Sequence, residues 1–164
     1  MVSEVSIVGA TAAFERNVRG ILASLPVWFV RAARLSRVEV TGDPKVREMI
    51  AVYDHEQRRL RVTPSVGAML KKAVYHELWH GVDDNFGHPH VFSSMDEWIR
   101  LHRNQPYFDI PKYREQPLEY LADCGAKLFL MGRERLSVTH PHEVGFIEQV
   151  AFPPLMEAFG GQQP

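Results

Sequence analysis

Two histidines and a glutamate stand close together in the stretch YHELWH, residues 75–80. On a helix, His76 and His80 share one face about 6 Å apart along the axis, because four residues make slightly more than one turn. Two imidazoles placed in this way can bind one Zn²⁺ through neutral nitrogens. Glu77 points to the side of that face, where it can act as a general base on a water without binding the metal. The same letters also fit a surface helix with two unrelated histidines, so a third ligand has to be found.

A catalytic zinc site needs a third protein ligand and one open position. One extended form of the motif places a glycine three residues, and a third histidine six residues, after the second histidine. Asp83 and Phe86 occupy those positions, which excludes that geometry. The other common form takes a glutamate from a later helix, and Glu119 and Asp123 are four residues apart on a helix predicted over 117–131. We expect Glu119 to bind zinc and Asp123 to accept a hydrogen bond from the far nitrogen of a ligand histidine.

The two carboxylates also fit a solvated helix face. Their apolar neighbours argue against that alternative, because a largely buried helix needs a reason to carry two carboxylates. These neighbours are Leu118, Leu121, Ala122, Ala126, Phe129 and Leu130. We therefore predict one catalytic Zn²⁺ bound by His76, His80 and Glu119.

Two segments of the sequence resemble a known family. HELWHGVDDNF, followed about forty residues later by EYLADCGAKLF, is similar to the gluzincin metallopeptidases. The similarity is closest to the catalytic domain of anthrax lethal factor and the Pro-Pro endopeptidases. It is strong over residues 74–86 and 117–130, weaker over 48–70 and 140–158, and not visible before residue 45. The resemblance implies a zincin-like fold and the same three zinc ligands, with Glu77 as the base.

Members of this family carry a tyrosine shortly before the ligand glutamate, and it donates to the oxyanion. Here the family spacing falls on Lys112, so Tyr113 is the best candidate, with Tyr107 second. Trp79 also departs from the family, where a small residue is usual. A tryptophan at this position could pack against the core or narrow the site.

The double aspartate Asp83-Asp84 after the motif is shared with the family. A carboxylate is unfavourable at the C-terminal end of a helix unless it bonds to something. We therefore expect structural roles for this pair, with support of the metal ligands by Asp84 as the alternative.

These residues together predict an endopeptidase that hydrolyses peptide bonds through a zinc-activated water. Glu77 takes a proton from that water and passes it to the leaving amine, while zinc and Tyr113 stabilise the oxyanion. By fold analogy, the substrate peptide is expected in extended form, as an added strand along the hairpin edge near residues 59–63. Two alternatives stay open: a non-cleaving binding module with a zincin fold, and the catalytic domain of a larger toxin or effector. The intact Glu77 speaks against the first.

The hydrophobic pattern predicts an α+β fold rather than alternating β and α units. Helices are predicted over residues 11–24, 27–35, 95–103 and 117–131, and in a last segment after Pro141. A further long helix is predicted to open at 64–65 and to carry the motif. Strands are predicted over 38–40, 50–53 and 60–63, and the last two are expected to form an antiparallel hairpin. Ser94–Glu97 has capping-box spacing, and Pro153-Pro154 is expected to break the last helix. We assign residues 1–159 to one zincin-like metallopeptidase domain with a small antiparallel or mixed sheet, and 160–164 to a disordered tail.

The composition fits a soluble globular protein of 164 residues with one sizeable core. A formal net charge of -1 argues against a nucleic-acid binder. Cys124 is the single cysteine, which favours a reducing compartment. Neither a signal-peptide pattern nor a run of 18 apolar residues is present, so no membrane span is expected. We expect a cytoplasmic protein, with export by a signal-independent route or residence in a larger protein as alternatives.

Overall fold

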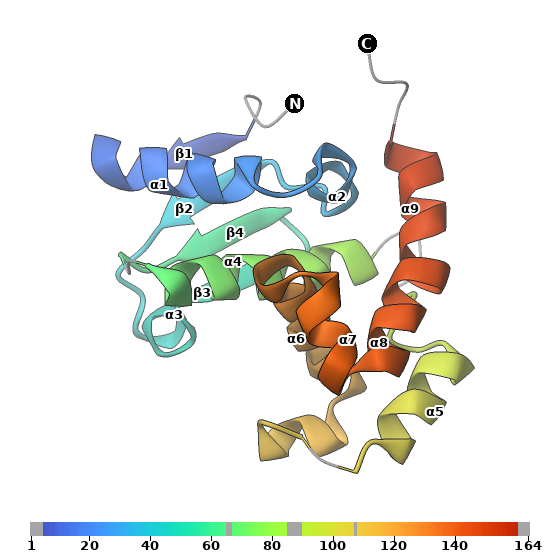
Figure 1. Ribbon diagram of the computed structural model, residues 1–164. Coiled ribbons are helices and arrows are strands. Elements are labelled where there is room, and N and C mark those ends of the chain that lie inside the picture. The colour runs from blue at the N-terminus through green and yellow to red at the C-terminus, as the bar shows by residue number, and fades with distance from the viewer. Residues whose placement is uncertain (1–4, 65–66, 85–89, 107, 161–164) are drawn as a thin grey trace.

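The structure, a computed structural model, describes residues 5–64, 67–84, 90–106 and 108–160. Within these residues the fold is α+β, as predicted, with a four-stranded mixed sheet beside a larger helical part (Figure 1). The strands are β1 (Ser6–Val8), β2 (Arg37–Val40), β3 (Ala51–Asp54) and β4 (Arg59–Val62). The helices are α1 (Ala12–Ala23), α2 (Val27–Ala32), α3 (Pro44–Met49), α4 (Ala68–Asp83), α5 (Asp96–Asn104), α6 (Pro117–Met131), α7 (Arg133–Thr139), α8 (Pro141–Phe146) and α9 (Phe152–Phe159).

The sheet has the strand order β1-β2-β4-β3. β3 and β4 pair antiparallel, with Tyr53 opposite Leu60, which confirms the predicted hairpin. β1 and β2 pair in parallel and are joined through α1 and α2, so the chain begins with a βαβ connection. Strand β1 is not among the predicted strands, because its three residues are too few to show a clear alternation of apolar and polar side chains.

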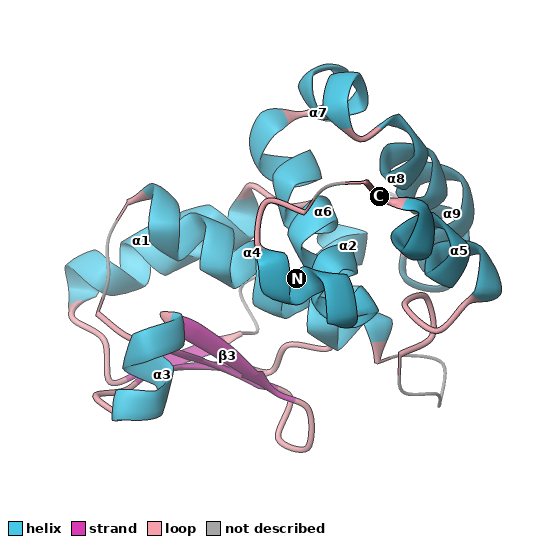
Figure 2. Ribbon diagram, turned by 90° about the horizontal axis from the view of Figure 1, so that it is seen from below, coloured by secondary structure: helices cyan, strands magenta, loops and turns pink. Residues whose placement is uncertain are grey.

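Helices α1 and α4 lie on one face of the sheet (Figure 2). The core between them is apolar and closed to solvent. Val18 and Leu22 of α1, Val38 and Leu60 of the sheet and Leu78 of α4 are all 0% exposed. The motif helix is therefore held against the sheet by its apolar side, which leaves its histidine side for other contacts.

Helix α3 lies between two predicted strands, in a segment where no helix is predicted. The Asp43 side chain accepts a hydrogen bond from the backbone N–H of Lys45 at 2.9 Å and so caps the first turn. An aspartate followed by a proline is a helix-start signal as well as a turn signal, and here the helix forms.

The predicted capping box of α5 is not formed. The residue that precedes the helix is Met95 rather than Ser94, and no side chain caps this end. The helix itself spans nearly the predicted range.

Pro153 and Pro154 do not break the last helical segment. α8 leads into a π-helical turn (Ile147–Ala151), and α9 follows directly with both prolines in its first turn. The helical stretch is continuous here, and the π-helical turn before the prolines interrupts the regular i→i−4 hydrogen bonds, which accommodates residues without an N–H. The predicted tail, residues 160–164, lies outside the described residues apart from Gly160.

Candidate metal centre

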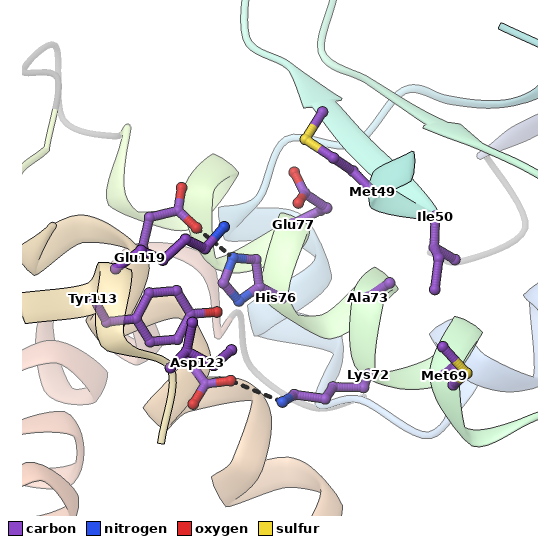
Figure 3. Close-up of a pocket in the computed structure, with 12 residues that line it drawn as sticks. Met49, Ile50, Met69, Lys72, Ala73, His76, Glu77, Tyr113, Glu119 and Asp123 are labelled. Carbon is purple, nitrogen blue, oxygen red and sulfur yellow. Dashed lines mark hydrogen bonds and ion pairs between the residues drawn. The ribbon is translucent and has the colours of Figure 1, made fainter. Parts of the chain in front are cut away.

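Helices α4 and α6 pack against each other and bring the three predicted zinc ligands together (Figure 3). His76 Nε2 lies 3.2 Å from His80 Nε2 and 3.1 Å from Glu119 Oε2. The other carboxylate oxygen of Glu119 lies 3.5 Å from His80 Nε2. Pro117 begins α6 without needing an N–H partner, and Glu119 extends from that first turn toward the histidines.

The spacing of these three residues fits one Zn²⁺. Donor atoms at the corners of a tetrahedron, each about 2.0–2.1 Å from zinc, are about 3.3 Å apart. The two imidazole nitrogens are 3.2 Å apart, and each lies 3.1 or 3.5 Å from one of the two Glu119 oxygens. Burial and the charge on His76 lower the pKa of His80 to about 4, so this imidazole is neutral, as a metal ligand must be. The hydrogen bond with His76 lowers the pKa of Glu119 and keeps that carboxylate ionised.

Glu77 lies beside the donor atoms and is anchored by the sheet. Its Oε2 accepts a hydrogen bond from the backbone N–H of Tyr53 at 2.8 Å. Burial raises the pKa of Glu77 to about 7, although the charge on His76 and this hydrogen bond both act to lower it. A carboxyl group with a pKa near neutrality can accept and return a proton at physiological pH. Local sequence patterns do not predict this contact, because it joins a strand residue and a helix residue that are 24 positions apart.

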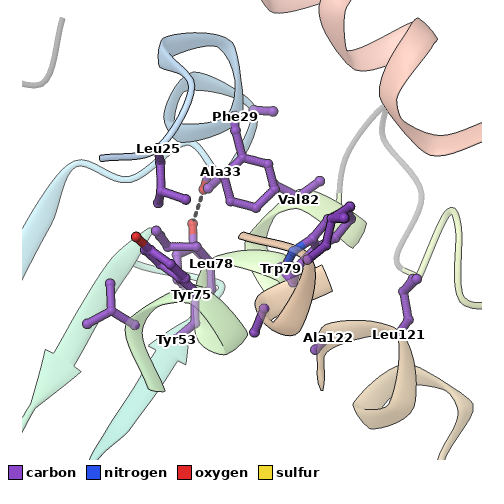
Figure 4. Packing of buried hydrophobic residues seen from close by; sticks show 14 of the residues in the cluster. Leu25, Phe29, Ala33, Tyr53, Tyr75, Leu78, Trp79, Val82, Leu121 and Ala122 are labelled. Atoms are coloured by element: carbon purple, nitrogen blue, oxygen red, sulfur yellow. Dashed lines mark hydrogen bonds between the residues drawn. The ribbon is translucent and has the colours of Figure 1, made fainter. Parts of the chain in front are cut away.

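Tyr53 is in turn fixed by its side chain. Its hydroxyl donates to the carbonyl of Ala33 at 2.5 Å (Figure 4). Burial raises the pKa of Tyr53 to about 12, so the hydroxyl remains a donor. A Cβ at Gly81 would lie 2.7 Å from the Tyr53 ring and 2.9 Å from the Ala33 carbonyl. Because Gly81 of the motif helix has no side chain, the Tyr53 ring has room to lie there. Tyr53 in this position holds β3 next to Glu77.

The predicted addition of a substrate strand near residues 59–63 is wrong. This segment contains β4, which pairs with β2 on one side and β3 on the other. The outer strand is β3, but Ala51 and Tyr53 are 0% and 6% exposed, and the Tyr53 N–H is bound to Glu77. One N–H of this edge strand is thus already bonded within the chain beside the candidate metal centre.

A cleft of about 390 Å³ opens onto the donor atoms. Met49, Ile50 and Met69 line one side of it, across from Glu119 and Tyr113 (Figure 3). The cleft leaves the candidate metal centre open to solvent and to a ligand, as a catalytic site would need. Lys112, which occupies the family's tyrosine position, also lines it.

Tyr113 lies in the cleft, within the 3-10 turn Pro111–Glu115. Its ring stacks on the His76 ring with centroids 6.5 Å apart, and its carbonyl accepts a hydrogen bond of 2.7 Å from Nε2 of the buried His102. Burial raises the pKa of Tyr113, so its hydroxyl stays protonated and able to donate. The second candidate, Tyr107, lies outside the described residues.

Asp123 forms ion pairs with two lysines and does not bond to His76 or His80. Its Oδ1 lies 2.9 Å from Lys72 Nζ, and its Oδ2 lies 2.9 Å from Lys127 Nζ. Burial alone would raise the pKa of Asp123, but the two lysines lower it. His80 Nδ1 is buried and has no hydrogen-bond partner within the described part of the chain. The predicted support of a histidine by Asp123 is therefore replaced by an ion pair that ties α4 to α6.

The two aspartates after the motif have different partners. Asp83 accepts hydrogen bonds from the backbone N–H groups of Phe92 and Ser93, at 2.6 and 3.0 Å, and from the Ser93 hydroxyl at 2.5 Å. It thus fixes the turn that precedes α5, as a structural role predicts. Asp84 Oδ2 lies 3.0 Å from His55 Nδ1 on the β3–β4 hairpin. Asp84 therefore contacts the hairpin. It does not support a predicted zinc ligand, which was the alternative role expected for it.

Trp79 packs against the core, which is the first of the two predicted alternatives (Figure 4). It is 1% exposed, stacks on Phe152 at 6.0 Å between centroids and meets Phe29 edge-on at 5.1 Å. A Cβ added at Gly125 of α6 would lie 2.1 Å from the indole ring. The tryptophan therefore fills the space left by a glycine on the facing helix, a complementarity that the sequence analysis misses.

The chain matches no protein-family model, no curated protein and no solved structure in the three comparisons made. Among the described helices, none combines the length and the apolar character needed to cross a membrane. The chemistry of the donor cluster is therefore the basis for assigning a function.

Proposed function

We propose that the chain is a zinc-dependent endopeptidase with a zincin-like fold. The observation that carries this proposal is the set of His76, His80 and Glu119 donor atoms, with the half-buried Glu77 beside it and an open cleft in front. Two imidazoles and one carboxylate leave a zinc position free, which is typical of catalytic rather than structural sites. The resemblance of the two motif segments to gluzincins supports the same assignment.

In this proposal the chain's own groups move one proton. Bound Zn²⁺ supplies a Lewis acid that polarises the peptide carbonyl and lowers the pKa of water. Glu77 removes a proton from the attacking water as the water oxygen bonds to the carbonyl carbon. When the carbon–nitrogen bond breaks, Glu77 gives the proton to the leaving amine. Burial raises the pKa of Glu77 to about 7 in the chain without the ion, and the charge of bound Zn²⁺ would lower it and favour the carboxylate that accepts the proton.

Tyr113 is the proposed donor to the carbonyl oxygen as negative charge develops on it. The contacts of its carbonyl with His102 and of its ring with His76 hold it at the cleft. A donor fixed before the reaction needs no reorganisation when the charge forms, which is the source of its effect on rate.

Cleavage of a peptide library by the wild type and by Glu77→Gln tests the proposal. We expect the wild type to produce fragments and the variant to be slower by a factor of about 10²–10⁴, the usual contribution of a general base. Both proteins should hold zinc equally, because Glu77 is not a ligand. Equal rates in the two proteins would contradict the proposed role of Glu77. A zinc-bound wild type that binds but cuts no peptide would favour the non-cleaving binding module.

A further inference from the structure

Ile50 joins α3 to β3 in a backbone conformation that its residue type rarely adopts. Its φ is 68° and its ψ is −42°. A β-branched residue at positive φ is an outlier, because Cβ and its two substituents crowd the backbone. Such conformations persist where the surroundings enforce them, and they cluster at functional sites.

Contacts with strand β4, and with Thr63 directly after it, hold Ile50 in this conformation. The carbonyl of Ile50 accepts hydrogen bonds from the N–H and the hydroxyl of Thr63, at 2.9 and 3.3 Å. At the other end of α3, Asp43 Oδ2 pairs with Arg61 of β4 at 2.7 Å. Both ends of α3 are thus anchored beside the sheet, and Ile50 connects the second anchor to β3.

The conformation places Ile50 between two cavities. Ile50 and Met69 both line the cleft at the candidate metal centre, and both also line a second cavity of about 620 Å³. The rest of the second cavity is formed by Thr41, Gly42, Arg47, Thr63 and Pro64. Ile50 is half-buried, while Met69 is 66% exposed, so the boundary between the cavities is an apolar surface open to a ligand (Figure 3).

We propose that Ile50 determines the specificity of the proposed peptidase. The substrate runs from the metal cleft across Ile50 into the second cavity, and a large apolar side chain of the peptide packs on Ile50 and Met69. Burying such a side chain removes apolar area of both partners from water, which favours it over a small residue. The flexible Met69 adapts to the shape of the bound side chain. This inference rests on the proposed endopeptidase activity.

Two substitutions at one position separate the backbone from the side chain. Ile50→Ala and Ile50→Gly both remove the apolar wall, but only glycine accepts the positive φ without strain. We expect the melting temperature of the glycine variant to exceed that of the alanine variant by about 2–4 °C. At an ordinary strand position the alanine variant has the higher melting temperature of the two. Val52→Ala on β3, which is half-buried and lines neither cavity, serves as the matched control.

The specificity is measured as the ratio of kcat/KM for peptides that differ by leucine or alanine at each position around the cleaved bond. The wild type and Val52→Ala should prefer leucine at one position by roughly tenfold or more, and both Ile50 variants should reduce that ratio to below about threefold. An unchanged ratio in both Ile50 variants would overturn the inference while leaving the peptidase assignment intact. A wild type without Glu77-dependent cleavage would overturn both. An alanine variant more stable than the glycine variant would refute the strained backbone on which the placement of Ile50 depends.

Discussion

Gly125→Ala tests the packing that holds together α4 and α6, the two helices that carry the proposed metal ligands. The added Cβ would lie 2.1 Å from Cε2 and Nε1 of Trp79, so either the indole or helix α6 has to move. Overpacking of this kind costs about 1–3 kcal/mol, and two aromatic rings around Trp79 leave it little room, which favours the upper end. The higher helix propensity of alanine returns about 1 kcal/mol. The net loss of unfolding free energy is then about 2 kcal/mol, or about 4–8 °C in melting temperature for a chain of this length.

Thermal and urea unfolding measure this loss, and Gly20→Ala is the matched control. Gly20 lies within α1, and a Cβ there meets nothing within 4 Å, so alanine should stabilise by about 0.5–1 kcal/mol. The same chemical change thus has opposite signs at the two sites. Trp79→Phe in the Gly125→Ala background should recover part of the loss. A Gly125→Ala protein as stable as the wild type, with Gly20→Ala behaving as expected, would refute the complementarity between Gly125 and Trp79.

Three further predictions concern the residues around the site. Asp83→Ala leaves the backbone N–H groups of Phe92 and Ser93 without their acceptor, and urea unfolding should show a loss of about 3 kcal/mol; a loss below about 0.5 kcal/mol would contradict the anchoring role. The pKa of Asp123 is lower in the folded chain than in the unfolded chain, where it is about 4. The ionised carboxylate therefore contributes its full stabilisation above about pH 4, and this stabilisation is lost as the pH falls through the folded-state pKa. Asp123→Asn should therefore lower stability by about 3 kcal/mol at pH 7, and the difference from wild type should shrink below about pH 4; a difference that is constant with pH would exclude the ion pair as its cause. Tyr113→Phe should lower kcat roughly 10²-fold with little change in KM, and an unchanged kcat would remove Tyr113 from the proposed mechanism.

The sequence predicts the local part of the site well. Four-residue spacing on a helix fixes which side chains share a face, so His76 and His80 follow directly from their positions. Glu119 could be predicted because its helix is marked by a proline at the start and a glycine at the end, with apolar residues between. These signals need no knowledge of how the helices cross.

The remaining features depend on how the helices and the sheet pack. Asp123 is one turn after Glu119 on α6, and that turn carries it toward Lys72, one turn before His76 on α4, and away from the histidines. Local spacing cannot give the direction in which two helices cross, so the predicted partner is wrong. The hydrogen bond from the Tyr53 N–H to Glu77 and the fit of Trp79 to Gly125 likewise join elements distant in the chain.

Zinc content after dialysis, measured by elemental analysis, tests the central claim most directly. The account predicts about one equivalent of Zn²⁺ in the wild type and in Glu77→Gln, and close to none in His76→Ala or Glu119→Ala. Circular dichroism of the same samples establishes that the depleted variants are folded. A wild type without zinc, or a folded His76→Ala protein that retains a full equivalent, would contradict the assignment of His76, His80 and Glu119 as the metal site.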